Sequence, residues 1–269
     1  MRIDALMFQL GLTPSREKAH ALILAGKVIV DGKPMQKPGT NVSEDAKIEI
    51  LDDPIPYVSR GGLKLQKALD KFNITVNCLT AVDVGASTGG FTDCMLQNGA
   101  KKVYAIDVGY GQLDWKLRND PRVVVMERRN ARAMNPDWFD ELPEFATIDV
   151  SFISTRLIFP ALYTCLKPEA YVVALIKPQF EAGRSDVGKN GVVRDPNVHI
   201  KVCEKSMEDA LSVGFHVCGL THSPITGPKG NIEFLALLQR SANDGNGVYL
   251  LPCETSVSCI VAQAHKELS

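Results

Sequence analysis

The sequence lacks any long apolar run. Its most apolar stretches, such as residues 171–176, have the length of a buried strand and fall far short of the roughly 20 residues that a helix needs to cross a bilayer. We also expect no secretory signal, because no long apolar run follows Arg2 and Asp4 near the start of the sequence. We therefore expect a cytoplasmic protein without a membrane span.

Paired cysteines are missing as well. The 7 cysteines are scattered, no two of them form a C-x-x-C pair, and no histidine stands at metal-ligand spacing from any of them. This pattern argues against both a disulfide framework and a zinc site. We expect buried thiols in a reducing compartment, and no metal.

Neither sign of charge is in excess. The chain has 30 basic and 31 acidic residues, so only local clustering can indicate an anionic partner. Hydrophobic residues make up 45% of the 269 positions, which is enough to build a core and excludes wholesale disorder. The length suits either one large domain or one medium domain together with a small one.

Residues 1–50 are a candidate small domain. A good helix start at residues 13–15 precedes apolar residues at helical spacing. Asp31-Gly32 is a strong signal for a tight turn between two short strands, and residues 47–50 alternate as a closing strand. The pattern predicts a compact α+β unit of two helices and a few short strands.

Basic residues outnumber acidic ones in the first forty positions, but composition alone leaves RNA binding and a merely solvated face as equal alternatives. The string RIDALMFQLGLTPSREKAHALILAGKVIVDGKPMQKPG closely resembles the small RNA-binding domain first described in a ribosomal small-subunit protein and shared by pseudouridine synthases and tyrosyl-tRNA synthetases. The resemblance implies that basic side chains face structured RNA. The matching positions are Arg2, Ser15, Arg16, Lys18, Lys27 and Lys37.

Residues 51–60 are expected to link this domain to a larger one at residues 61–269, because prolines and aspartates gather near their start. Within the larger domain, a β-branched run, a glycine-rich turn at residues 85–90, a helical segment and a strand at residues 103–106 predict a βαβ unit. Such a unit can bring backbone N–H groups and a helix N-terminus against a ligand.

Three kinds of site compete for the glycine-rich turn. Its G-x-x-x-G-G spacing differs from the G-x-G-x-x-G of dinucleotide sites. Residues 85–89 satisfy the G-x-S-x-G of a hydrolase elbow, but neither His222 nor His265 has a convincing setting as its partner. A methyl-donor site accounts for the glycines, Asp83 and Asp107 together, since a carboxylate after the second strand can accept both hydroxyls of a ribose. We therefore favour the methyl-donor site.

The residues expected to bind the donor are Asp83, Gly85, Ser87, Gly89, Gly90, Asp107 and Asn130. The pattern DVGASTGGFTD…AIDVGYGQL closely resembles the hemolysin A (TlyA) family of ribosomal RNA ribose methyltransferases, relatives of the FtsJ heat-shock methyltransferase. The resemblance covers essentially the whole chain. It implies an α/β fold, with a Rossmann-like doubly wound methyltransferase sheet behind a small N-terminal α+β RNA-binding domain.

The resemblance also implies a function. The cofactor is S-adenosylmethionine, and the substrate is ribosomal RNA within ribosomal subunits, methylated at ribose 2'-hydroxyls. Cytidines in subunit-interface helices are the expected targets, on the large subunit at least. The alternative is a non-catalytic RNA-binding or assembly factor that has kept the same fold. The name hemolysin has no counterpart in the sequence, which contains no pore-forming segment.

Four ionisable residues near the ends of expected elements match the Lys-Asp-Lys-Glu tetrad of ribose 2'-O-methyltransferases: Lys64, Asp149, Lys177 and Glu233. A single such residue usually marks only the point where a strand meets water, but a complete tetrad indicates catalysis. We expect Lys177 to accept the hydroxyl proton, Asp149 to orient it and Glu233 to hold Lys64.

A basic rim around the site is also expected. Arg60 and the arginines of residues 118–132 are its candidate members, and contacts from them to phosphate would make RNA binding salt-dependent. Some of these arginines are expected to pair with local acids instead.

Overall fold

The computed structural model describes residues 1–24, 27–35, 37–50, 55–183, 185–242, 247–250 and 256–268. The chain divides into two compact units, Met1–Pro54 and Ile55–Ser269. Of the linker expected at residues 51–60, residues 51–54 lie outside the described part. No helix in the described ranges is both long and apolar enough to cross a membrane.

The first unit packs two short helices on a three-stranded antiparallel sheet of order β2-β1-β3. Its elements are α1 (Ile3–Gln9), α2 (Arg16–Leu24), β1 (Val28–Val30), β2 (Lys33–Met35) and β3 (Ile48–Ile50). Asp31 and Gly32 join β1 to β2 with φ angles of 48° and 77°. Two successive residues in the left-handed region make the tight turn that the Asp-Gly pair predicts.

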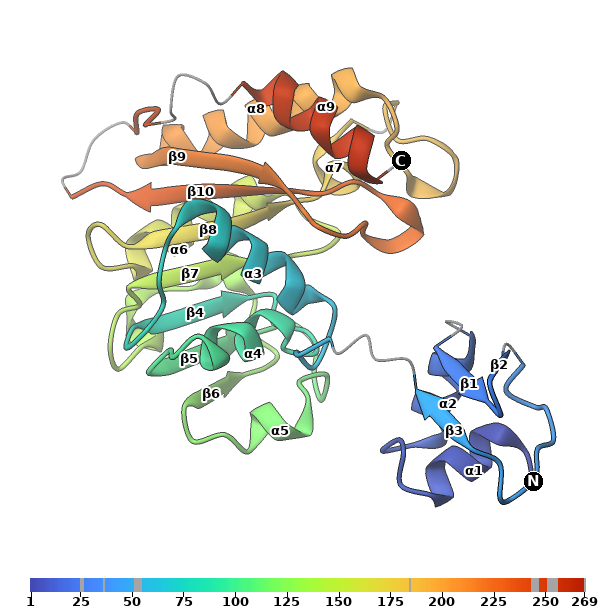
Figure 1. Cartoon of the computed structure of the whole chain (residues 1–269). Coiled ribbons are helices and arrows are strands. Elements are labelled where there is room, and N and C mark those ends of the chain that lie inside the picture. The colour runs from blue at the N-terminus through green and yellow to red at the C-terminus, as the bar shows by residue number, and fades with distance from the viewer. Residues whose placement is uncertain are drawn as a thin grey trace. The chain divides into compact units, whose positions relative to one another are not determined.

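The second unit is a sheet covered by helices on both faces (Figure 1). Its helices are α3 (Gly61–Phe72), α4 (Gly90–Gln97), α5 (Trp115–Arg118), α6 (Phe159–Cys165), α7 (Pro178–Glu181), α8 (Pro196–Val213) and α9 (Val257–Leu268). Its strands are β4 (Thr80–Val84), β5 (Lys102–Ile106), β6 (Val123–Met126), β7 (Phe145–Ile148), β8 (Tyr171–Ile176), β9 (Phe215–His222) and β10 (Phe234–Arg240).

The strand order is β6-β5-β4-β7-β8-β10-β9. The first five strands are parallel, and β10 runs antiparallel to both of its neighbours, β8 and β9. The predicted doubly wound α/β sheet is therefore confirmed. The order reverses between β4 and β7, and sheets of this kind bind ligands outside the carboxyl ends of the strands at such a point.

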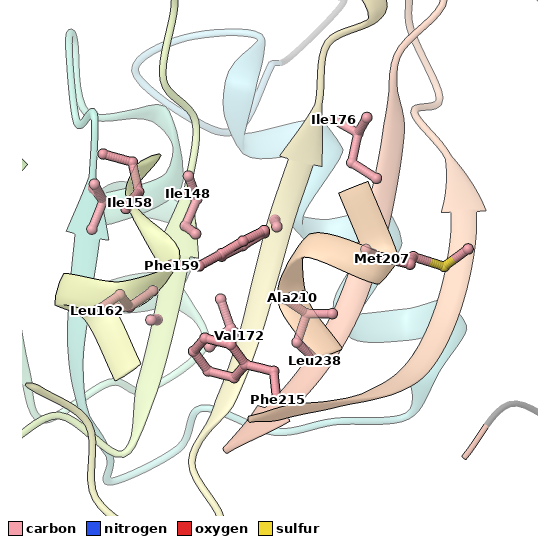
Figure 2. Close-up of a cluster of buried hydrophobic side chains, with 14 of the residues drawn as sticks. Ile148, Ile158, Phe159, Leu162, Val172, Ile176, Met207, Ala210, Phe215 and Leu238 are labelled. Carbon is pink, nitrogen blue, oxygen red and sulfur yellow. The ribbon is translucent and has the colours of Figure 1, made fainter. Parts of the chain in front are cut away.

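Side chains alternate between the two faces of the sheet. On β4, Val82 and Val84 join the core under α6 and α8, whereas Ala81 joins the core under α3 and α4. Phe159 of α6 and Phe215 of β9 pack edge-on in the first core, with ring centroids 5.9 Å apart (Figure 2). A sheet buried on both faces needs near-continuous apolar strands, and β8 and β10 have them.

Local sequence sets both ends of α8, the longest of these helices. The Asp195 side chain accepts the N–H of Asn197, and Pro196 occupies the first turn, where its missing N–H costs nothing. At the other end Gly214 has a φ of 113°, the left-handed conformation that closes a helix.

A pair of histidines joins the C-terminal helix α9 to α8. The Nδ1 atom of His199, which is fully buried on α8, lies 2.9 Å from Nε2 of His265 on α9. Burial, with the neighbouring His265, lowers the pKa of His199 to about 4. His199 is therefore neutral at pH 7, and Val261 and Ala264 complete the apolar contact of α9 with the core.

We predict that His199 makes stability depend on pH. Because its pKa falls from 6.5 to about 4 on folding, its stabilisation is complete above pH 6.5 and is lost as the pH falls toward 4, by up to about 3 kcal/mol. In denaturant unfolding at about pH 7 and pH 4.5, wild type should lose more stability than His199→Gln. Equal losses in the two proteins would exclude this role.

Candidate active site

The glycine-rich loop between β4 and α4 lies at the point where the strand order reverses. Gly85 and Gly89 have φ angles of 88° and 94°, a region that glycine enters without strain. A Cβ on Gly85 would lie 2.6 Å from the backbone oxygen of Asp149, which follows β7. The ends of β4 and β7 are thus in close backbone contact, and only glycine fits between them.

Asp107, directly after β5, faces this loop. Its carboxylate accepts the N–H of Ser87 at 2.8 Å and the N–H of Gly109 at 2.7 Å. Each carboxylate oxygen keeps a further lone pair, so the group can still accept two hydroxyls from a ligand. The two backbone bonds fix the direction in which it does so.

A cavity of about 270 Å³, here called the donor cavity, opens over these strand ends. Its polar lining includes Gly85, Ser87, Asp107 and Asn130. Its apolar lining includes Ile106, Val108, Val150, Ile153 and Ile158. The side-chain oxygen of Asn130 accepts the N–H of Arg132, so the side-chain amide nitrogen is the group available to a ligand.

A second cavity of about 200 Å³, here called the acceptor cavity, adjoins the first. It is lined by all four members of the predicted tetrad, and also by Gly90. The two cavities share Gly85, Ser87 and Asp149. The structure therefore brings together residues that are up to 169 positions apart in the chain.

The tetrad forms two close ion pairs. Lys64 donates to Oε2 of Glu233 at 2.5 Å, and Lys177 lies 2.5 Å from Oδ1 of Asp149. Glu233 is fully buried, and the two lysines are only 8% and 9% exposed. Buried charges of this kind persist only when each one has a close partner. Two paired but nearly water-free amines are thus held beside the donor cavity.

Three neighbouring side chains were not predicted from the sequence. Ser151 accepts a hydrogen bond from Lys177 at 2.9 Å, and Gln179 donates to Oε1 of Glu233 at 3.4 Å. Phe152 lines the donor cavity, is 89% exposed and has a φ of 65°. The only feature of the sequence that could have indicated them is their proximity to the tetrad, since each lies within three residues of Asp149 or Lys177.

Asp83, the penultimate residue of β4, lines the acceptor cavity rather than the donor cavity. Its buried carboxylate accepts the hydroxyls of Thr92 at 2.7 Å and Thr147 at 2.9 Å. Burial raises its pKa to about 6, although the two threonine bonds act in the opposite direction. These two bonds tie β4 to α4 and β7 at the wall of the acceptor cavity.

In the first unit, the predicted RNA-binding residues are partly tied to one acid. Arg2 and Arg16 bond Asp4 at 3.0 Å and 3.2 Å, while both guanidinium side chains stay about half exposed. Ser15 is engaged as a helix cap, because its hydroxyl accepts the N–H of Lys18. The side chains of Lys18 and Lys37 are exposed, and that of Lys27 is half-buried.

In the second unit, Arg60 is exposed at the start of α3. Two arginines of residues 118–132 pair with local acids: Arg118 with Glu127 at 2.5 Å and Arg122 with Asp120 at 2.7 Å. Arg118 and Arg122 are thus two of the arginines that pair with a local acid.

The hydrolase interpretation fails on geometry. Among the described residues, no histidine lines either the donor or the acceptor cavity. His222 lies against Lys67 and Glu267 instead, and His265 against His199. Ser87, in the G-x-S-x-G string, therefore lacks the base that an esterase mechanism requires.

A carboxylate placed for a ribose, a glycine loop and a lysine–carboxylate cluster at one strand reversal define a Rossmann-like methyltransferase. Comparison with known proteins agrees: residues 57–240 match the family model of FtsJ-like methyltransferases, and residues 1–48 match that of the S4 domain. The chain belongs to the FtsJ-like methyltransferase family, and within it to the TlyA (hemolysin A) group.

Similar proteins span the chain. A Bacillus subtilis protein provisionally named as the rRNA methyltransferase YqxC is 51% identical, over 99% of this chain and 95% of its own length. The 16S/23S rRNA (cytidine-2'-O)-methyltransferase TlyA of Mycobacterium tuberculosis is 45% identical, over 88% of this chain and 89% of its own. A solved Streptococcus thermophilus structure described as a hemolysin is 50% identical, covers 99% of this chain and 96% of its own, and gives a TM-score of 0.79.

We predict that Gly85→Ala destabilises the protein by about 2–4 kcal/mol, because it combines a left-handed φ with a collision against backbone. Gly111 is a matched control, since its φ is 70° but nothing lies within 4 Å of a Cβ there. Gly111→Ala should cost only about 1 kcal/mol. Equal losses for both variants in urea unfolding would show that the β4–β7 contact is unimportant.

Proposed function

We propose that the protein transfers a methyl group from S-adenosylmethionine to ribose 2'-hydroxyls of ribosomal RNA, with cytidine as the target nucleoside. The observation that carries this proposal is the junction of the two cavities at Gly85, Ser87 and Asp149. A donor bound in one cavity meets an acceptor bound in the other without leaving the protein. Alignment of this kind is a large part of catalysis in group transfer.

The donor cavity suits the chemistry of S-adenosylmethionine. Asp107 would accept the two ribose hydroxyls, the amide of Asn130 would donate to the adenine edge, and the apolar lining would contact the base. The loop N–H groups of Gly85 and Gly89 donate to backbone oxygens of the protein, so the N-terminus of α4 at Gly90 would meet the charged end of the donor. When bound, the donor supplies a methyl group already activated on a sulfonium.

The acceptor cavity has the groups that a hydroxyl nucleophile needs. A ribose hydroxyl is a poor nucleophile near neutral pH, so its proton must leave as the new bond forms. In its neutral form Lys177 would accept that proton at Nζ, and Asp149 and Ser151 would hold the resulting ammonium. Glu233 keeps Lys64 beside the acceptor oxygen.

Support for ribosomal RNA comes from two directions. The first unit matches the S4 domain and exposes Arg2, Arg16, Lys18 and Lys37 for contacts to phosphate. The relatives are named for rRNA methylation, at cytidine 2'-oxygens in the M. tuberculosis protein. We place the enzyme in the cytoplasm with its ribosomal substrates. A non-catalytic assembly factor would give no reason for two buried, paired lysines at a ligand cavity.

The test is transfer of labelled methyl from S-adenosylmethionine to unmodified ribosomal subunits. Lys177→Ala should lower kcat by about 10²- to 10⁴-fold, because it removes the proton acceptor, and it should leave donor affinity within a few-fold. Lys205→Ala, at an exposed lysine paired with Asp209, is the control and should match wild type. Label in 2'-O-methylcytidine supports the proposal, whereas full activity in Lys177→Ala or label only on a base contradicts it.

A further inference from the structure

A third cavity, of about 480 Å³, opens between the start of α3 and the loop at residues 223–233. It shares Gly61 and Lys64 with the acceptor cavity. Its lining contains the cations Arg60 and Lys229, together with Lys64, whose charge Glu233 compensates, and none of the described residues that line it is acidic. A concave site with one sign of charge selects an anion.

The loop that forms one wall of this cavity is built directly on the tetrad. The N–H of Ser223 donates to the backbone oxygen of Glu233 at 2.8 Å, and the N–H of Gly227 donates to that of Asn231 at 2.8 Å. A Cβ on Gly227 would overlap the Glu233 carboxylate, so the loop backbone passes against the group that holds Lys64. The position of the wall is therefore tied to the position of the tetrad.

The two exposed cations stand at the two sides of the cavity. Arg60, at the start of α3, donates to the backbone oxygen of Thr226 in the loop at 3.4 Å. Lys229 is exposed and has a φ of 61°, a conformation that costs a lysine about 1 kcal/mol or more. Strained residues cluster at functional sites, so the conformation of Lys229 is consistent with a role in binding.

The chemistry of RNA supplies the anion. The 2'-hydroxyl and the 3'-phosphate of a nucleotide are attached to neighbouring ribose carbons. A ribose whose 2'-hydroxyl is presented to Lys177 and Asp149 therefore carries its 3'-phosphate to a position next to the acceptor cavity. The third cavity is the neighbouring cationic site, because Lys64 belongs to the lining of both.

We propose that the third cavity binds the phosphodiester on the 3' side of the methylated ribose, through Arg60 and Lys229. The inference rests on the proposed function, since it takes the acceptor to be an RNA ribose. The ribose is then held at C2' through its hydroxyl in the acceptor cavity and at C3' through its phosphate in the third cavity. Held at these two carbons, it directs the 2'-oxygen toward the donor. The enzyme then requires an internal nucleotide, and a 3'-terminal nucleoside is not an acceptor.

The first test uses the full chain and ribosomal subunits. Lys229→Ala and Arg60→Ala should each raise KM for the subunits about tenfold and lower the slope of log affinity against log salt by about 1, with donor affinity unchanged. Lys229→Arg should restore KM, because it keeps the charge. Lys201→Ala, an exposed lysine of α8 outside the cavity, is the control. An unchanged KM and salt slope in both alanine variants overturns the inference.

The second test needs no turnover. Cytidine 3'-monophosphate, cytidine 5'-monophosphate and cytidine are titrated into the donor-saturated protein and followed by NMR. We expect the 3'-monophosphate to bind several-fold more tightly than the other two, and Lys229→Ala to abolish that preference. Equal binding of all three ligands, or no binding of any at millimolar concentration, overturns the inference.

The two tests also separate this inference from the proposed function. If wild type methylates no RNA but keeps the Lys229-dependent preference for the 3'-monophosphate, the proposed activity fails and the phosphate site stands. If wild type methylates RNA but the variants keep its KM and salt slope, only the phosphate site fails.

Discussion

The backbone contact between Gly85 and Asp149 is the constraint on which the site depends. It closes the gap between β4 and β7 at the point where the strand order reverses, and both residues line the donor and the acceptor cavities. A side chain at position 85 would force the strand ends apart and misalign the two cavities together. Donor binding and acceptor chemistry are therefore set by one packing distance, and small displacements of reacting groups are costly in group transfer.

The electrostatics of the site follow from that packing. Lys64 and Lys177 are almost completely buried, a condition that is strongly unfavourable for an ammonium without a partner. Glu233 and Asp149 each lie 2.5 Å from one of them and compensate the charge. Burial raises the pKa of the Asp83 carboxyl, and its hydrogen bonds from the hydroxyls of Thr92 and Thr147 offset part of that effect. Burial disfavours the charged form of all three side chains. Carboxylates compensate the two lysines, and hydroxyl hydrogen bonds compensate Asp83 in part.

The fold was largely predictable because its signals are local. The apolar runs at residues 103–106 and 171–176 placed β5 and β8 to within a residue. Asp107 could be anticipated because it directly follows a strand. The contacts of Asp83 could not be anticipated, because Thr92 and Thr147 reach it from α4 and β7 only in the folded protein.

The tetrad was reached from a family resemblance rather than from spacing. Lys64 and Glu233 are 169 positions apart, and no feature of the sequence around either residue predicts their contact. The third cavity was not predicted at all. Lys229 follows a proline in a loop rich in glycine, a composition typical of any surface turn, and only the tertiary structure brings it beside Arg60 and Lys64. Arg118 and Arg122 show the opposite case, because their acidic partners are close in sequence and could be anticipated.

The reversed strand β10 also orders the events of folding. Among the described strands, β9 pairs only with β10, although it is synthesised first. During synthesis β9 must therefore wait for the chain to return before it can join the sheet, and long-range pairing of this kind is slow. Glu233 directly precedes β10 and is therefore positioned when β10 pairs with β8. Lys64 gains its counter-charge only when the sheet is completed, so an incomplete chain, however well its first five strands have formed, has no assembled tetrad with which to act on RNA.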